Sequence, residues 1–131
     1  MSVHIPSGMN QVMPYLIVKG AAQLQEFMTV VFGAREHSMH ADEDGNIMHA
    51  QVLIGESLIM FSDARGEFEP MTAGMFIYVE DADASYHKAI EAGGTTIMPL
   101  SDQEYGRTCG VMDPTGNTWW ITSVKSGDAA Q

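Results

Sequence analysis

The sequence predicts an α+β fold in which two β-α-β-β-β modules form a curved mixed sheet around an internal cavity, with the helices outside. Three observations predict this fold. A strand, a helix and three further strands can be followed along the chain, and the same order then begins again. Residues of matching type recur 61 positions apart, as Val18 and Val79 or Gly33 and Gly94 do. A chain of 131 residues, 45% of them apolar, is one domain, and each half is too small to bury its sheet alone.

The first module is predicted over about residues 11–62. Apolar residues at i, i+3, i+4 and i+7 indicate an amphipathic helix, and Gly33 is the residue expected just past its end. The run Asp42–Asn46 predicts a turn, because Asp-Gly and Gly-Asn pairs adopt positive φ at little cost. The helical apolar positions are Leu24, Phe27, Met28 and Val31. The predicted strands are Met13–Val18, Arg35–His40, Ile47–Ile54 and Ser57–Ser62.

A linker with Gly and Pro is predicted over residues 63–74, and the second module over about 75–124. Asp81 or Asp83 is expected to cap the second helix, where the helix dipole favours negative charge. Residues 113–116 predict a turn, and residues 125–131 a polar tail. The predicted strands are Met75–Val79, Thr95–Leu100, Thr108–Met112 and Asn117–Thr122.

The composition excludes several classes of function. Six Lys and Arg against 17 Asp and Glu give a formal net charge of −11, which repels nucleic acids and anionic membranes and attracts cations. No apolar run approaches the roughly 20 residues of a membrane span, and the N-terminus lacks the features of a signal peptide. A single cysteine, Cys109, suits a reducing cytoplasm and lacks the neighbours of a catalytic thiol. Eleven methionines favour an adaptable apolar pocket, with a loosely specified core as the alternative.

Three segments together resemble the vicinal oxygen chelate superfamily, which contains glyoxalases, bleomycin resistance proteins and extradiol dioxygenases. The most specific part of the resemblance is the Asp-Pro-x-Gly-Asn turn that leads into an aromatic last strand. The residues of the three segments are most similar to those of the PhnB-like group. The resemblance covers about residues 11–124. The segments are Pro14–Val18 with Phe32-Gly33-Ala34, Asn46–Val52 with Ile59–Asp63, and Tyr105-Gly106-Arg107 with Asp113–Trp120.

The resemblance also implies where a metal site would lie. Metal-dependent members carry His or Glu at four places, and this chain has Met13, Met60, Met75 and Trp120 there. Divalent ions of these enzymes prefer imidazole and carboxylate ligands, which neither these residues nor their immediate neighbours offer. The chain is therefore expected to have no metal site and no cofactor.

Strand periodicity predicts which side chains face the cavity. In Ile47–Ile54, alternation places Ala50 against a helix and His49 and Gln51 toward the cavity, where they could orient a polar ligand. Trp119 and Trp120 are adjacent, so one should pack under a helix, and the resemblance implies that Trp120 faces the cavity. His37 and His40 lie three apart and are expected on opposite faces. The predicted ligand-binding residues are Met13, Tyr15, His49, Gln51, Met60, Met75, Arg107 and Trp120.

These expectations favour a metal-free homodimer that sequesters an aromatic or cationic small molecule without turnover, as bleomycin resistance proteins do. Two alternatives remain. One is a metal-dependent enzyme of the glyoxalase or dioxygenase type with a displaced site near His49 and acids such as Glu56 or Glu104. The other is a dimeric scaffold without a small ligand. For Arg107 the sequence leaves two roles open, pairing with an acid across the cavity or lying at its rim.

Overall fold

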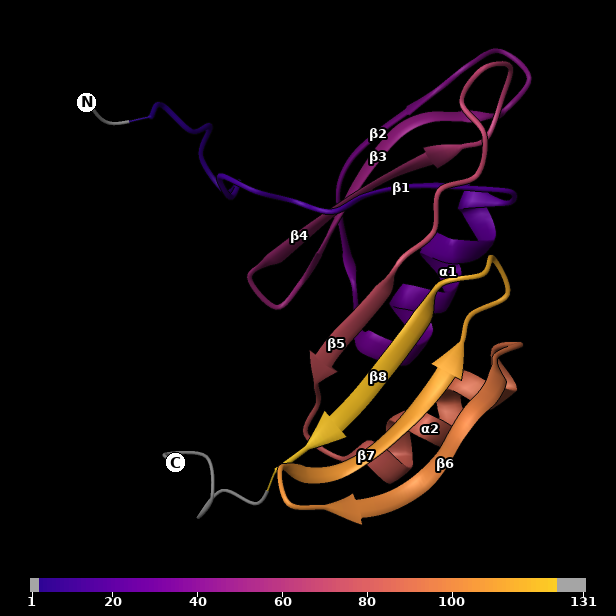
Figure 1. Ribbon diagram of the computed structural model, residues 1–131. Helices are drawn as coiled ribbons and strands as arrows, with labels where there is room; N and C mark the ends of the chain where they lie inside the picture. Colours follow the sequence, from indigo (N-terminus) through magenta and orange to yellow (C-terminus); the bar gives the residue numbers. More distant parts are fainter. Residues whose placement is uncertain (1–2, 125–131) are drawn as a thin grey trace.

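Two four-stranded β-sheets, each backed by one α-helix, make up the part of the chain that the structure describes (Figure 1). The computed structural model describes residues 3–124, so the polar tail predicted at 125–131 lies outside the described residues. The helices are α1 (Ala21–Phe32) and α2 (Ala82–Glu91). The strands are β1 (Tyr15–Val18), β2 (Arg35–Ala41), β3 (Ile47–Ile54), β4 (Ser57–Asp63), β5 (Gly74–Tyr78), β6 (Thr95–Gln103), β7 (Gly106–Met112) and β8 (Thr118–Ser123). The α+β class and the two β-α-β-β-β modules are confirmed.

The two modules build their sheets with the same strand order. The first sheet runs β1-β4-β3-β2 and the second runs β5-β8-β7-β6, and in each the first strand lies parallel to the last. All strand pairing found within residues 3–124 stays inside one module. The curved mixed sheet is therefore divided, in a single chain, into two separately hydrogen-bonded halves.

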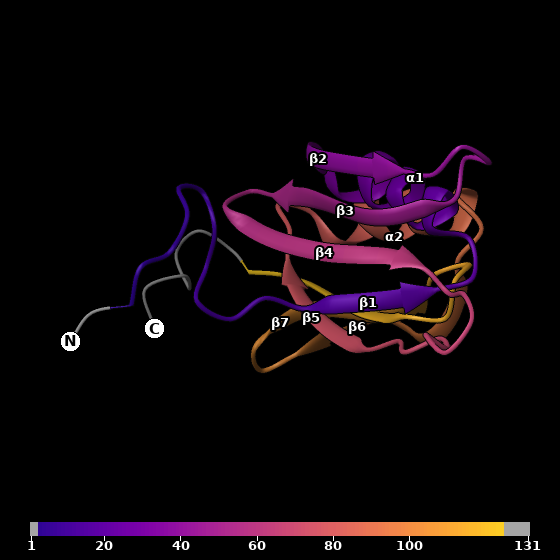
Figure 2. The ribbon, with the colours of Figure 1, turned by 90° about the horizontal axis from the view of Figure 1, so that it is seen from above.

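The sides of the two sheets that face away from the helices are called here the first and the second open face. Figure 2 shows the first sheet from the side opposite α1, and Figure 1 shows the second sheet with α2 behind it. The two views differ by a quarter turn. The open faces of one chain are thus not opposed to each other, so a single chain does not enclose the cavity expected between them.

Helix α1 joins the two modules. Its buried residues are Ala21, Leu24, Phe27, Met28 and Val31, and the last four are the stripe predicted from the sequence. Gly33 ends the helix at φ 70°, and its N–H reaches the carbonyls of the last turn. At the start of the helix, a carboxylate oxygen of Asp63 accepts the N–H of Ala21 at 2.8 Å, and its second oxygen accepts the N–H of Ile47.

The turn between β7 and β8 is organised by the buried carboxylate of Asp113. This carboxylate accepts hydrogen bonds from the backbone and side chain of Thr115 and from those of Asn117. It also accepts the indole N–H of Trp119 at 2.8 Å. Asn117 in turn accepts the N–H of Ala73, just before β5. The turn therefore fixes both the entry into β5 and the first residues of β8.

The ring of Trp119 connects the cores of the two modules. Trp119 is 1% exposed, and its ring centroid lies 4.7 Å from that of Phe32 at the end of α1. One continuous apolar cluster contains residues of both sheets, among them Phe61 from β4 and Ile121 from β8. Burial of Trp119 on the helix side confirms the strand phase predicted for the Trp119-Trp120 pair.

We expect Trp119→Ala to lower the free energy of unfolding by about 3–5 kcal/mol, because it leaves a cavity and removes a donor from Asp113. Trp120→Ala, on the open side of the same strand, should change it by about 1 kcal/mol or less. Urea unfolding followed by circular dichroism measures both. A larger loss for Trp120→Ala than for Trp119→Ala would contradict this assignment.

Candidate functional site: a junction cleft and two open faces

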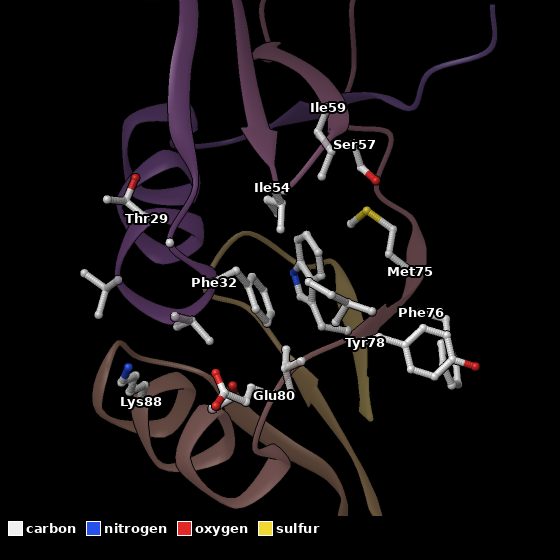
Figure 3. Close-up of a pocket in the computed structure, with 18 of the residues that line it drawn as sticks. Thr29, Phe32, Ile54, Ser57, Ile59, Met75, Phe76, Tyr78, Glu80 and Lys88 are labelled. Atoms are coloured by element: carbon white, nitrogen blue, oxygen red, sulfur yellow. The ribbon is translucent and has the colours of Figure 1, made fainter. Parts of the chain in front are cut away.

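A cleft of about 980 Å³ lies where the two modules meet (Figure 3). Its walls are the end of α1, the β3–β4 hairpin, strand β5 and one side of α2. Its lining combines apolar side chains with polar groups, among them Glu80 and Lys88 at the α2 side. Of the predicted ligand-binding residues, Met75 is the one that lines it. The apolar side chains that reach it include Phe32, Ile54, Ile59, Met75 and Trp119.

The position of Met75 differs from the prediction. Met75 is in register with Trp119, so both lie on the helix side of the second sheet. Phe76 is in register with Trp120 and shares its face instead. Met75 therefore does not face a common cavity with Trp120, because the phase of β5 is shifted by one residue from the expected one. The sequence carries no signal for this phase, because both faces of the five-residue strand are apolar or aromatic.

Aromatic rings cover the second open face around Trp120. Adjacent to Trp120 on β7 is Gly110, where a Cβ atom would lie 2.5 Å from the Trp120 ring, so the indole lies over a site that accepts glycine alone. The ring of Phe76 lies 5.3 Å from that of Tyr78 and 6.2 Å from that of Tyr105. Phe76, Tyr78 and Tyr105 are 51%, 67% and 51% exposed. The result is an aromatic surface open to solvent.

Arg107 lies on the opposite side of this sheet. Its guanidinium donates to Asp83 in the first turn of α2 at 2.9 Å and lies 3.4 Å from Asp102. The hydrogen bond from Arg107 holds the pKa of Asp83 below its ordinary value, and the same contact raises the pKa of Arg107. Arg107 therefore ties α2 to β7, and neither role considered for it at the cavity applies.

The first open face brings together four of the predicted residues. Tyr15, Met60 and Gln51 form one cross-strand row over β1, β4 and β3, and His49 lies two residues before Gln51. Tyr15 Oη lies 3.2 Å from His49 Nδ1, and Gln51 Nε2 lies 2.9 Å from His49 Nε2. Met13 precedes β1 and is partly exposed.

A fifth side chain on this face, His37, was not among the predicted ligand-binding residues. The register of β2 shifts between Glu36 and Ser38, so His37 occupies a β-bulge, and its Nδ1 lies 2.8 Å from Gln51 Oε1. His40 is directly opposite His49 across the same strand pair. His37 and His40 therefore lie on the same face, and the expectation of opposite faces was wrong because a bulge changes the alternation. No local sequence pattern indicates this bulge.

The comparisons with known proteins agree with this architecture. The model of the Glyoxalase/Bleomycin resistance protein/Dioxygenase superfamily matches residues 8–121. The chain belongs to this superfamily. An uncharacterised protein of Mycobacterium bovis is 30% identical over 118 residues, which cover 81% of this chain and 78% of that protein.

Several solved structures share the fold. The PhnB protein of Bacillus cereus, described as a putative 3-demethylubiquinone-9 3-methyltransferase, superimposes with a TM-score of 0.70 at 19% identity, covering 88% of this chain and 100% of that one. TioX of Micromonospora gives 0.72 at 21%, covering 87% and 98%. The fosfomycin resistance protein FosX of Mesorhizobium loti gives 0.65 at 17%, covering 98% and 100%. At these identities the likeness concerns the fold.

Within residues 3–124, no group of three or more His, Cys, Asp or Glu side chains is arranged to hold a metal ion. In the same part of the chain, no helix is long and apolar enough to cross a membrane.

Cys109 lies in the core under α2 and has no part in either open face. Burial raises the pKa of its thiol to about 11, so the thiolate is disfavoured in the folded protein. The Cys109 thiol is therefore expected to be unreactive and to serve as a core side chain.

We expect the Cys109 thiol to react with Ellman's reagent at about pH 8 at least a hundredfold more slowly in the folded protein than in urea. Between pH 9.0, the ordinary value for a thiol, and about 11, the unfolded chain releases a proton that the folded chain keeps. Stability should therefore fall as the pH rises through this range. Because Cys109 is the single cysteine, the absorbance of the released reagent thiolate reports on Cys109 alone. Rapid reaction of the folded protein would contradict a buried thiol.

Proposed function

We propose that the protein sequesters an aromatic small molecule, without metal and without turnover, between a first and a second open face. The observation that carries this proposal is the surface formed by the exposed rings of Phe76, Tyr78 and Tyr105 on the face that the half-buried Trp120 shares. A planar ligand stacked on such rings gains about 0.5–1.5 kcal/mol beyond the burial of its area. The polar row of Tyr15, His49 and Gln51 could then orient its substituents. The single unpaired cysteine supports a cytoplasmic location.

The distribution of acidic residues favours an aromatic ligand over a cationic one. Three acidic residues lie within the described strands: Glu36, Asp63 and Asp102. Each contacts the helix side of its sheet: Glu36 bonds Gln25 of α1, Asp63 caps α1, and Asp102 lies beside Arg107. The strand positions of both open faces thus lack the carboxylates that would bind a cation directly.

A homodimer is part of the same proposal, because the open faces of one chain are not opposed. Strand β5 supports it: it is an edge strand with the apolar sequence Gly74–Tyr78, without charge or proline. Of the other outer strands, β2 has charged residues, β6 contains Pro99 and an irregular register, and the uncharged β1 pairs with the linker through Ile17 and Met71. These features protect an edge against pairing, and β5 lacks them. We propose that a second copy covers β5 and brings its first open face over the second open face.

We expect Trp120→Ala to weaken binding of naphthamide, a neutral bicyclic aromatic probe, by about three- to tenfold. Isothermal titration measures this, and Trp119→Phe, which keeps an aromatic ring in the core, serves as the control. Equal affinity of Trp120→Ala and the unmodified protein would place the ligand elsewhere. About one metal ion per chain in elemental analysis, restored after chelation, would favour the metal-dependent enzyme instead.

We expect Tyr78→Asp to convert a dimer into monomers at micromolar concentration, because it introduces a charge at the edge strand proposed to be covered. Light scattering coupled to gel filtration measures the mass. Ile97→Asp on β6, which is 47% exposed, is the matched control and should leave the dimer intact. A monomeric unmodified protein, or dissociation by Ile97→Asp alone, would contradict the proposed interface.

A further inference from the structure

We infer that the first open face is an anion-binding subsite, so that the aromatic ligand carries an oxyanion such as a carboxylate. This inference rests on the proposed function, since it assigns the polar end of the same ligand. It is carried by a cluster of hydrogen-bond donors on a face whose strand positions hold no acidic residue. The cluster comprises Tyr15, His37, His40, His49 and Gln51.

The hydrogen bonds fix the direction in which each group of this cluster donates. The Gln51 amide nitrogen is a donor only, so His49 Nε2 accepts from it at 2.9 Å. A neutral His49 then carries its proton on Nδ1 and donates it to Tyr15 Oη at 3.2 Å. The hydroxyl hydrogen of Tyr15 is therefore left over and is available to a ligand. Since Tyr15 is 44% exposed, a ligand on this face can reach it.

The network of hydrogen bonds that begins at Tyr15 ends at His37, and His37 can take up a positive charge without breaking it. Gln51 Oε1 is an acceptor only, so His37 Nδ1 donates to it at 2.8 Å. A second proton on His37 Nε2 leaves this bond unchanged, so His37 can become cationic without rearrangement. A second proton on His49 would instead lie on Nε2 and face the N–H of the Gln51 amide, so two donors would be opposed and this hydrogen bond would be lost. His37, rather than His49, is thus the imidazole that this network allows to charge.

Few other charges face His37 and His40. The open-face neighbours on β3 and β1 are His49, Gln51 and Tyr15, and those on β4 are the uncharged Met60 and Ser62. Gly8 of the N-terminal segment contributes backbone alone beside His37 Nε2. Arg35, at the start of β2, donates to the carbonyl of Gly55 in the hairpin. Glu36 of β2 and Asp63 of β4 bond to the helix side of the sheet. The remaining carboxylates nearby lie outside the strands, in the exposed turns at Glu56 and at Asp42–Asp44, and the whole chain carries a net charge of −11.

The first open face therefore offers an oxyanion two types of donor at separate places: the Tyr15 hydroxyl from β1, and the imidazoles of His37 and His40 on β2, the opposite outer strand. Imidazoles take up protons between about pH 8 and 5, whereas a carboxylate remains ionised down to about pH 4. Affinity for an aromatic carboxylate should consequently rise as the pH falls through this range. Affinity for the corresponding neutral amide should not depend on pH.

The test compares naphthoate with naphthamide and naphthylmethylamine by isothermal titration on the full chain at about pH 8 and pH 5.5. We expect naphthoate to bind about fivefold more tightly at the lower pH, the effect of one partly exposed charge-assisted hydrogen bond. Naphthamide should bind equally at both. The double variant His37→Gln and His40→Gln should abolish the pH dependence for naphthoate. His87→Gln, an exposed histidine on α2, is the matched control and should retain it.

The outcomes separate this inference from the proposed function. If naphthoate and naphthamide bind alike at both pH values while Trp120→Ala weakens both, the aromatic site stands and the anion subsite is wrong. Tighter binding of naphthylmethylamine than of naphthoate at pH 5.5 would also overturn the subsite. If none of the three probes binds, both the proposed function and the subsite are wrong. Loss of the pH dependence in His87→Gln would assign the effect to another part of the molecule.

Discussion

The hydrogen bond from the Trp119 indole to the buried Asp113 carboxylate is the constraint on which the arrangement of the second module depends. Asp113 closes its own turn through Thr115 and Asn117, so the carboxylate is held in place before β8 begins. The indole bond then fixes the side on which Trp119 leaves the strand, toward Phe32 of the first module. Because side chains alternate along a strand, Trp120 must point the other way. The position of Trp120 on the second open face therefore follows from the hydrogen bond that holds Trp119 in the core.

The same kind of turn occurs twice in the chain, but with different consequences. Asp42 and Asn46 repeat the bonds of Asp113 and Asn117, and a glycine of positive φ stands at the equivalent place in both turns. The first turn is exposed and joins β2 to β3, whereas the second is buried and joins β7 to β8. The two positions are not equivalent in the module repeat. This hydrogen-bonding pattern thus stabilises a tight hairpin turn wherever it occurs. In the second turn it also orients a core side chain, because the Trp119 N–H reaches the Asp113 carboxylate.

The elements that depend on local chemistry could be predicted from the sequence, and those that depend on pairing between strands could not. The α1 stripe, an acidic cap of α2 narrowed to Asp81 or Asp83, and the phases of β3 and β8 follow from residue types at fixed spacing, and the structure makes Asp81 the cap. The phase of β5 was wrong because a five-residue apolar strand has no polar face to mark it. The position of His37 depends on a bulge set by the partner strand, and the role of Arg107 on an acid 24 residues away. Such features are fixed by tertiary contacts, which a single sequence does not display.

The two modules have the same scaffold but opposite surface chemistry, and this difference links binding to association. The first open face carries imidazole, amide and phenol groups, and the second carries aromatic rings over Gly110. In one chain the two faces point in different directions, so a ligand that needs both must contact two copies in the proposed dimer. Such a ligand binds the dimer and not the separate chains, and therefore stabilises the dimer by mass action. A ligand that touches one face alone would leave the association unchanged. Coupling between ligand affinity and protein concentration thus follows from the geometry of the open faces, independently of which aromatic molecule occupies them.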